Sequence, residues 1–581
     1  DHAAAGLFDG YLVNPDTGDR TYVATGVALS VCDVSRDGRY ALIRRGPRSE
    51  REIVLVELGT GVERRLPASG PDRLGTVGFA RFFVDGHTAY LQTDAGRERI
   101  ALLAVKLPDH GGPEPCGLAD TADPTWDDVQ VLAARDDADL DRFTLVPDGR
   151  SVALAWNVDG RSELEILDLE TLRRRVLPPP PRDVVTSLLA TSDGRWLVMA
   201  LDGSAAPGQL WTYDLTSGFA GYRRLVAPGE DAPGESGLGE VGLGQVGLGE
   251  AGLGEAGLGG SGFGSAAATP PWGSVDGAAP GWPSAGAARP PLTAVADLPV
   301  VPDRRPAVRP VLERFRAHDG LELTGWLYRP PATQGPGPMM LHFHGGPEAQ
   351  ERPTYNPLFQ ALVAAGVSVF APNVRGSAGY GRSFVRGDDR EQRFAGIADV
   401  ASCVEYLTGA GLAEAGRIGV MGRSYGGYLT LAALVEYPEL FRVGVDVCGI
   451  ADLETFYRNT EPWIAASAVT KYGDPDRDRG LLRTLSPIHR FDRLTSPLLV
   501  VHGVNDTNVP LFEAEQTVAA ATAVGVPVRF LLFDDEGHEA HGTANRLLFV
   551  QTVVRWILDN LLSMDVRGPS EPVRDLTRSA V

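Results

Sequence analysis

The residues best suited to chemistry in this sequence surround Ser424. The segment Gly422-Arg-Ser424-Tyr-Gly426-Gly427 follows an apolar run at 418–421 and precedes a helical run. A serine hydroxyl is a weak nucleophile unless a tight turn exposes it beside a base, and small flanking residues permit that turn. A helix that begins just after the serine also directs backbone amides at developing negative charge. The segment therefore predicts a nucleophile elbow with Ser424 as the attacking group.

A base and an orienting acid are expected further along the chain. Asp506 follows the apolar run 497–501, and His538 follows the run 528–533. The order Ser, Asp, His, with each residue just past a parallel strand, is the order that α/β-hydrolases use. In this arrangement Ser424 attacks, His538 takes and returns the proton, and Asp506 orients the imidazole and stabilises its cation.

Neighbouring residues offer alternatives for these roles. His541 lies three residues from His538 and could serve as the base, although we expect it to fall inside the following helix. The acidic run 534–536 could supply the acid, although such a run is typical of a solvated loop. His502 stands at a strand end and is most simply a packed structural residue.

A second glycine-containing loop indicates where negative charge would be stabilised. His344-Gly345-Gly346-Pro347 directly follows the apolar run 339–343. Consecutive glycines let a backbone amide approach an oxyanion closely, although a simple glycine turn has the same composition. We expect the amides of Gly346 and Tyr425 to form the oxyanion hole.

The elements that must hold these residues alternate from about residue 305 onward. Strands are expected at 323–328, 339–343, 367–371, 418–421, 443–447, 497–501 and 528–533, and helices near 356–365, 391–409, 426–436, 511–524 and 542–563. Continuous apolar strands separated by amphipathic helices imply a mostly parallel, doubly wound sheet covered on both faces. This is the α/β-hydrolase fold class.

Residues 6–226 repeat a different pattern. Asp-Gly pairs recur at 37–38, 85–86, 148–149 and 193–194, and each is followed by a short apolar run. Asp-Gly between β-prone runs favours tight hairpins. A repeat of about 45 to 50 residues with several short strands is typical of β-propeller blades. We count about five such units, the first partial; an ordinary β-sandwich is the alternative.

These patterns divide the chain into five parts. We expect a β-propeller domain over 1–228, truncated at its N-terminus, a Gly-rich insertion over 229–290, a linker over 291–304, the α/β-hydrolase catalytic domain over 305–565 and a C-terminal tail over 566–581. Nineteen of the 58 residues from 229 to 286 are glycine. Such a tract cannot bury enough apolar area to offset its backbone entropy, so we expect it to be disordered.

Composition limits the class of partner. The 54 basic and 75 acidic residues give a net charge of −21, and only Lys106 and Lys471 among the basic residues are lysines. An acidic chain without a basic block is not expected to bind nucleic acid or a membrane surface. The four cysteines are scattered without metal-ligand spacing, so we expect no metal, no cofactor and no disulfide framework, and a cytoplasmic location.

The motifs together resemble the prolyl oligopeptidase family of serine peptidases. The resemblance is carried by 315–320, 325–328, 344–347, 373–381, 422–427, 486–487, Asp506 and His538. It implies a propeller that caps the active site and admits short or unstructured peptides or acylated amino acids. Relatives range from monomers to tetramers, so a homo-oligomer is compatible with the resemblance.

Three features place the chain within that family. His344 stands where prolyl oligopeptidases and dipeptidyl peptidases carry a tyrosine that assists the oxyanion, and Asn508 stands where many members carry an arginine that grips a substrate carbonyl. Dipeptidyl peptidases hold the substrate amine with adjacent glutamates, and this chain has no Glu-Glu pair. With His344 the chain is more similar to acylaminoacyl-peptidases and related bacterial oligopeptidases, and the absence of a Glu-Glu pair weakens the case for a dipeptidyl activity.

The segment 450–457 matches the region that lines the primary specificity pocket in relatives. Leu453, Phe456 and Tyr457 are the residues expected to hold an apolar side chain, although their helical spacing suits core residues equally well. His344 and Asn508 are also expected to contact the substrate. A serine peptidase acting through an acyl-enzyme is the leading hypothesis. The same triad would also serve an esterase, an amidase or an acyl-transferring cyclase, and a non-catalytic peptide-binding propeller is the third reading.

Overall fold

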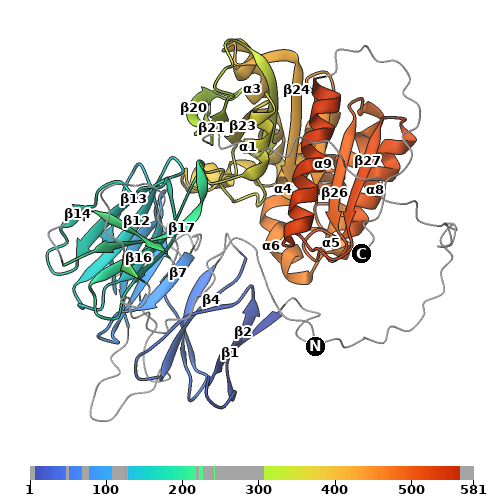
Figure 1. The fold of residues 1–581 in the computed structure, drawn as a ribbon. Coiled ribbons are helices and arrows are strands. Elements are labelled where there is room, and N and C mark those ends of the chain that lie inside the picture. The colour runs from blue at the N-terminus through green and yellow to red at the C-terminus, as the bar shows by residue number, and fades with distance from the viewer. Residues whose placement is uncertain are drawn as a thin grey trace.

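The computed structural model describes residues 7–47, 51–67, 77–107, 125, 128–216, 221–226, 241–242 and 307–562. Figure 1 shows a part built of β-sheets, coloured blue to green, and an α/β part, coloured yellow to red. The expected Gly-rich insertion, apart from residues 241–242, lies outside the described residues, as do the expected linker and tail.

The described residues of the first part form five sheets, which run in chain order. Their strands are β1 (Leu7–Val13) and β2 (Arg20–Val27); β3 (Ser30–Val34), β4 (Tyr40–Arg45), β5 (Glu52–Glu57) and β6 (Glu63–Arg65); β7 (Val77–Phe82), β8 (Thr88–Thr93), β9 (Ala101–Lys106) and β10 (Val129–Ala133); β11 (Asp139–Leu145), β12 (Ser151–Val158), β13 (Arg161–Asp168) and β14 (Arg174–Val176); β15 (Val184–Ala190), β16 (Trp196–Gly203), β17 (Ala206–Asp214), β18 (Tyr222–Val226) and β19 (Val241–Gly242).

The Asp-Gly turns join the first and second strands of the four larger sheets. Gly38, Gly86, Gly149 and Gly194 have φ between 68° and 72°, a conformation that glycine adopts at little cost. Buried clusters then lie between consecutive sheets: one joins β3–β6 to β7–β10, the next joins β7–β10 to β11–β14, and the third joins β11–β14 to β15–β18. Each sheet is thus stabilised by its neighbour along the chain.

The second part is one eight-stranded sheet of order β20-β21-β23-β22-β24-β25-β26-β27. Its strands are β20 (Val311–Arg316), β21 (Glu322–Tyr328), β22 (Gly337–Phe343), β23 (Ser368–Asn373), β24 (Ala413–Arg423), β25 (Val443–Val447), β26 (Leu498–Gly503) and β27 (Val528–Phe533). The pairs β20–β21 and β21–β23 are antiparallel, and the other neighbours are parallel. The expected mostly parallel sheet is confirmed.

Helices cover both faces of this sheet (Figure 1). One buried cluster packs α1 (Pro357–Ala364) and α9 (Thr543–Leu561) against the strands. The other buries side chains of α3 (Arg393–Gly409), α4 (Tyr425–Glu436) and α8 (Leu511–Ala523). The shorter helices α2 (Arg382–Val385), α5 (Leu453–Asn459), α6 (Pro462–Tyr472) and α7 (Arg479–Leu485) complete this part.

The two parts meet at the loops that follow β22 and β23. Arg352 Nη1 lies 2.7 Å from Asp141 Oδ2, and Asn157 Nδ2 donates to Gln350 Oε1 at 2.6 Å. Further bonds are donated by Arg99 to Gly379 O, by Ser383 Oγ to Glu98 and by Gln360 Nε2 to Ser204 O. Because these loops leave the carboxyl ends of the parallel strands, the β-sheet part lies against that edge of the α/β part.

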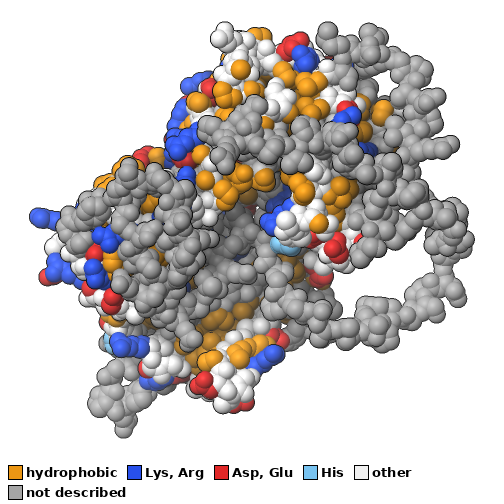
Figure 2. Space-filling model, viewed as in Figure 1, with side chains coloured by type: hydrophobic (Ala, Val, Ile, Leu, Met, Phe, Trp, Pro, Cys, Tyr) orange, Lys and Arg blue, Asp and Glu red, His pale blue; other side chains and the backbone are white. Residues whose placement is uncertain are grey.

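Acidic, basic and apolar side chains are interspersed over the described residues on the face shown in Figure 2. None of the described helices combines the length and the apolar character that crossing a bilayer requires.

Candidate active site

Ser424 occupies a strained turn between β24 and α4. Its φ of 58° and ψ of −118° lie where residues with a side chain are rarely found. The turn is fixed on both sides, since Ser424 N donates to Val447 O at 2.8 Å and Ser424 O accepts from Tyr428 N at 2.9 Å. Strain that is held in this way is expected where a side chain must be presented for function.

Glycine permits the close packing behind this turn. A Cβ atom at Gly426 would lie 1.9 Å from Phe343 O, and a Cβ atom at Gly422 would lie 2.3 Å from Gly426 O. The lack of a side chain at Gly426 therefore lets α4 approach β22 this closely, and the lack of one at Gly422 lets β24 and α4 meet at the turn. The glycines of the motif set the path of the backbone, and the serine is its one reactive group.

Asp506 and His538 form a hydrogen-bonded pair at the same edge of the sheet. His538 Nδ1 lies 2.7 Å from Asp506 Oδ2, the Asp506 side chain is fully buried, and the His538 side chain is 18% exposed. An ionised carboxylate only accepts hydrogen bonds, so the proton of a neutral His538 lies on Nδ1. The lone pair is then on Nε2, as a general base requires.

The ionised state of Asp506 has a clear cause. Burial acts to raise the pKa of Asp506, but the hydrogen bond and charge of His538, with His502 and the Val509 amide, lower it below its ordinary value. Asp506 Oδ1 also accepts from the Asn508 and Val509 amides, both at 2.9 Å. The carboxylate is therefore ionised and fixed in orientation.

Glu536 anchors the loop that carries His538. Its Oε2 accepts from His541 N at 2.9 Å, and its Oε1 accepts from Gly542 N at 2.8 Å. Gly503 allows the same loop to reach β26, since a Cβ atom there would lie 2.5 Å from Glu536 O. Glu536, which the sequence offered as a rival acid, is instead the residue that shapes this loop.

His541 lies in the loop ahead of α9, so the expectation that it falls inside the helix was wrong. The helix begins two residues later, at Thr543, because Glu536 holds the backbone of His541 and Gly542 in the loop. The His541 side chain is exposed. The imidazole bonded to Asp506 belongs to His538.

The loops that carry Ser424 and His538 are joined by an ion pair between their neighbours. Arg423 Nη2 lies 2.6 Å from Glu539 Oε1, with both side chains partly exposed. Among the hydrogen bonds of the described residues, none joins Ser424 Oγ to His538 Nε2. In unliganded enzymes such bonds are often long and tighten only when substrate binds.

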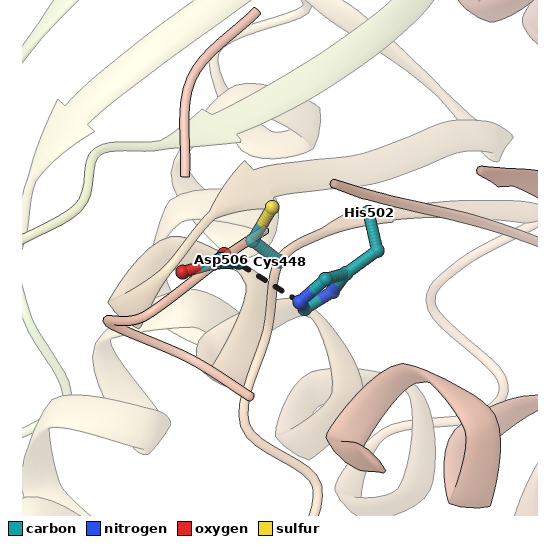
Figure 3. A group of neighbouring side chains, drawn as sticks. All are labelled: Cys448, His502 and Asp506. Atoms are coloured by element: carbon teal, nitrogen blue, oxygen red, sulfur yellow. Dashed lines mark ion pairs between the residues drawn. The ribbon is translucent and has the colours of Figure 1, made fainter. Parts of the chain in front are cut away.

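Cys448 and His502 lie beside Asp506, and Figure 3 shows the three side chains converging. Their potential ligand atoms lie within 4.8 Å of one another, a spacing that a metal ion could use. His502 Nε2 donates to Val509 O at 2.8 Å and lies 3.5 Å from Asp506 Oδ2, and the Cys448 thiol also contacts Asp506. We therefore read the group as a hydrogen-bonded support for Asp506.

The His344–Pro347 loop lies directly against the elbow. A Cβ atom added to Gly345 would lie 3.4 Å from Ser424 Cβ. Gly346 has φ of 127°, and Tyr425 is the first residue of α4, where backbone amides have no partner within the helix. The structure thus brings the two expected donor segments to the serine.

His344 is held within the chain. It is 9% exposed, and its Nδ1 and Nε2 lie 2.8 Å from Gly345 O and Ser377 Oγ. Burial lowers the pKa of His344, which favours the neutral imidazole. These contacts give His344 a role in fixing the glycine loop, and its expected contact with substrate remains a prediction.

The residues expected to form the specificity pocket differ in burial. Leu453 and Phe456 are 0% and 3% exposed and belong to the main core cluster, whereas Tyr457 is half-buried with its hydroxyl bonded to Gly473 O at 2.8 Å. The half-buried Asn508 follows Asp506, and its carbonyl accepts from Thr460 Oγ1 at 2.8 Å. Of the three pocket candidates, Tyr457 retains the most accessible surface.

The segment that carries this site is similar to known proteins. Residues 353–563 match the profile described as the Prolyl oligopeptidase family. This match lies within the α/β part and includes Ser424, Asp506 and His538. The resemblance drawn from the motifs is thereby confirmed, and with it the assignment to a family of serine-type peptidases.

Two named proteins illustrate the similarity of this chain to known sequences. Dipeptidyl aminopeptidase BIII of Pseudoxanthomonas mexicana is 33% identical over 255 residues, which are 43% of this chain and 36% of that protein. Acylamino-acid-releasing enzyme 2 of Oryza sativa subsp. japonica is 27% identical over 212 residues, which are 35% of this chain and 27% of that protein. The chain thus spans about a third of the length of these relatives.

Solved structures match both parts of the chain. A puromycin-hydrolyzing peptidase of Mycobacterium tuberculosis gives a TM-score of 0.69 at 18% identity, covering 97% of this chain and 80% of that one. A structure described as puromycin hydrolase gives 0.68 at 18% identity, covering 93% and 71%. An α/β-hydrolase domain preceded by a β domain, as in prolyl oligopeptidase family enzymes, is therefore the fold of this chain.

Proposed function

We propose that this protein is a serine peptidase that cleaves short peptides through an acyl-enzyme on Ser424. The observation that carries the proposal is the placement of a strained serine turn at the same sheet edge as the Asp506–His538 pair. Family membership of residues 353–563 supports the same chemistry. The proposal includes no metal or cofactor in the reaction, since the residues at the site supply a nucleophile, a base and an acid.

Acylation follows from the geometry of the pair. Ser424 Oγ adds to the scissile carbonyl carbon while its proton passes to His538 Nε2. The imidazolium that forms is stabilised by Asp506, whose carboxylate stays ionised. The tetrahedral oxyanion accepts hydrogen bonds from the amides of Gly346 and Tyr425. Collapse breaks the peptide C–N bond, and His538 gives its proton to the departing amine.

Deacylation reverses these roles with water. Water adds to the ester carbonyl, and its proton passes to His538 Nε2 as the second oxyanion forms. The intermediate then expels Ser424 Oγ, which takes the proton back from His538 and releases the carboxylic acid. The enzyme is thereby restored, and the net change is hydrolysis of one peptide bond.

The β-sheet part limits access in this proposal, acting as a propeller that covers the site. Two features support it. Consecutive sheets bury apolar clusters between them. The contacts Arg352–Asp141 and Asn157–Gln350 join the β-sheet part to a loop at the carboxyl edge of the parallel sheet. The substrates are therefore short or unstructured peptides, whereas folded proteins are excluded. We also propose a cytoplasmic location, because scattered cysteines without a disulfide framework suit a reducing compartment.

The substrate class is an N-terminal segment of a peptide, either acylated or carrying a free amine. Proteins with names of both kinds, a dipeptidyl aminopeptidase and an acylamino-acid-releasing enzyme, are similar to this chain. Because the chain has no Glu-Glu pair to hold a free amine, we favour the acylated substrate.

A peptide library tests the proposal directly. Incubation of the protein with acylated, free-amine and internally quenched peptides, followed by mass spectrometry, reports the bond cleaved and the side-chain preference. We expect cleavage of short peptides that is lost in Ser424→Ala and retained in Ser467→Ala. Ser467 is the matched control because it lies in α6, where its hydroxyl donates to Trp463 O. Turnover by Ser424→Ala within tenfold of wild type would reject the proposal.

A further inference from the structure

A cluster of buried charges lies beneath the two segments assigned to the oxyanion hole. At its centre is Lys471, near the end of α6, which is 3% exposed. Lys471 Nζ lies 3.0 Å from Asp388 Oδ1, 2.7 Å from Asp389 Oδ1 and 3.7 Å from Glu348 Oε1. One ammonium therefore serves carboxylates from two different loops.

The cluster reaches both segments of the oxyanion hole. Glu348 stands two residues after Gly346, in the loop that follows β22. On the other side, Asp388 Oδ2 accepts a hydrogen bond from the Tyr425 hydroxyl at 3.0 Å. The contacts Glu348–Lys471–Asp388–Tyr425 thus connect the glycine loop to the first residue of α4.

Arg393 fixes the tyrosine end of this connection. Its guanidinium is fully buried and lies 4.9 Å from the centre of the Tyr425 ring and 4.4 Å from that of Tyr472. Arg393 Nη1 also lies 3.1 Å from Asp388 Oδ2. Burial raises the pKa of Tyr425 well above its ordinary value, so its hydroxyl keeps the proton that it donates to Asp388.

A lysine suits the centre of this cluster. Its ammonium is compact and has three N–H donors that can point to separate acceptors, whereas the guanidinium of arginine is a planar fork. Burial acts to lower the pKa of Lys471, but Asp388, Glu348 and Asp389 raise it overall, so the side chain is charged. Removal of this charge would leave buried carboxylates without their shared cation.

We propose that Lys471 is a positioning residue for the oxyanion hole. By holding Glu348 and Asp388 on one ammonium, it fixes the Gly346 loop relative to the Tyr425 amide. Its catalytic consequence rests on the proposed function, because the two amides stabilise the oxyanion only if the serine reacts. Loss of the ammonium would displace one donor from the other, and displacements of about 1 Å are enough to slow catalysis.

The first test compares Lys471→Met with Lys106→Met, which changes the only other lysine, at the exposed end of β9. Each is assayed on an ester and on its thionoester, whose C=S group is a poor hydrogen-bond acceptor. We expect Lys471→Met to lower kcat for the ester about 10- to 100-fold with a smaller change in KM. The thionoester should be affected much less, and Lys106→Met should match wild type.

Two results of this assay would overturn the inference. One is a kcat for Lys471→Met close to that of wild type. The other is an equal loss on ester and thionoester, which would indicate a general structural defect rather than a displaced oxyanion donor.

The second test does not depend on turnover. Hydrogen exchange followed by mass spectrometry is measured over 344–350 and 424–428 in the same variants. We expect faster exchange in both segments of Lys471→Met, whereas Lys106→Met should match wild type. Unchanged protection would overturn the inference. A wild-type protein without turnover would reject the proposed function, while this exchange measurement would still decide the role of Lys471.

A second variant covers the case in which Lys471→Met does not fold. Glu348→Gln keeps the contact between Lys471 and Asp388 and weakens only the contact to the glycine loop. Faster exchange confined to 344–350 is expected, with 424–428 unchanged. Equal protection of 344–350 in Glu348→Gln and wild type would contradict the proposed connection.

Discussion

The pKa values of two buried carboxylates, Asp506 and Glu513, are shifted in opposite directions. Asp506 is held ionised, because His538 and two backbone amides offset its burial. Glu513 is fully buried and accepts hydrogen bonds from the Ala451 and Asp452 amides and the Thr455 hydroxyl, all of them uncharged donors, and burial raises its pKa to about 7. The first arrangement suits catalysis, and the second makes the contact between α8 and the start of α5 sensitive to pH.

Replacing Asp506 tests the proposed role of its charge. In Asp506→Asn the amide oxygen and nitrogen cannot fix the imidazole tautomer or stabilise its cation, so we expect kcat to fall by about 10⁴-fold with the fold retained. Asp534→Asn, in the exposed acidic run, is the control and should leave kcat unchanged. Steady-state kinetics on one short peptide measure both, and equal activity of Asp506→Asn and wild type would contradict the assignment.

Replacing Glu513 tests its raised pKa. Between about pH 4.5 and 7 the native state holds a proton that the unfolded state releases, so the contribution of Glu513 to stability falls as pH rises through this window. The free energy of unfolding of Glu513→Gln relative to wild type should therefore increase by up to about 3 kcal/mol between pH 5 and pH 8. Urea unfolding measures it.

Glu515→Gln is the control for this experiment, since Glu515 lies exposed on the same helix, α8. Its free energy of unfolding relative to wild type should be independent of pH over this range. A similar independence for Glu513→Gln would show that the pKa of Glu513 is not raised.

At the scale of elements, local patterns predicted most of the framework. Alternation of apolar runs and amphipathic stretches predicted seven of the strands in the α/β sheet, and Asp-Gly pairs predicted the turns of the β sheets, because both signals are short-range. Among the elements that were not predicted are β20 of that sheet, strand β14 and helix α6. β14 is three exposed residues, and α6 lies between β25 and β26 without a strong apolar stripe.

The sequence allowed the main residues of the site to be predicted, but not the residues that support them. The motif around Ser424, and the order of Asp506 and His538, were visible because each follows an apolar strand. The roles of Glu536 and Lys471 were not, because both depend on contacts that join segments with no shared pattern: Lys471 meets Asp388 across 83 residues of sequence. Charge and spacing alone give no signal for such contacts.

The elbow gives a prediction at this scale. In Gly426→Ala the new methyl group would overlap Phe343 O, so α4 must move away from β22. We expect the free energy of unfolding to fall by about 1–3 kcal/mol and the activity to be lost. Gly480→Ala in α7 is the matched control, because a Cβ atom there meets no atom within 4 Å. Thermal unfolding and peptide turnover compare the two; equal stability of the variants would contradict this account of the elbow.

At the scale of the whole molecule, the proposed limit on substrate size depends on the interface between the two parts. Arg352 is central to it: its guanidinium contacts Asp141 Oδ2, Gly160 O and Ser162 Oγ across the interface. These bonds tie the loop after β22, which also carries the expected oxyanion donor, to the β-sheet part. In the proposed function, this one loop therefore affects both the access of substrate and the oxyanion hole.

Weakening this interface should relax the size limit. In Arg352→Ala we expect a loss of about 1–3 kcal/mol of interaction between the two parts, and faster cleavage of long peptides relative to short ones. Arg150→Ala, which removes an exposed ion pair with Asp168 inside the β-sheet part, is the control. Competition between a short and a long labelled peptide measures the ratio; an unchanged ratio in Arg352→Ala would contradict gating at this interface.

The measurement that tests the account most directly is covalent labelling by a fluorophosphonate, mapped by mass spectrometry. Reaction at one serine alone, Ser424, is predicted in wild type, with labelling abolished in His538→Ala and preserved in His541→Ala. A folded wild-type protein that takes up no label, or label found on another serine, would contradict the claim that these three side chains form one nucleophilic site.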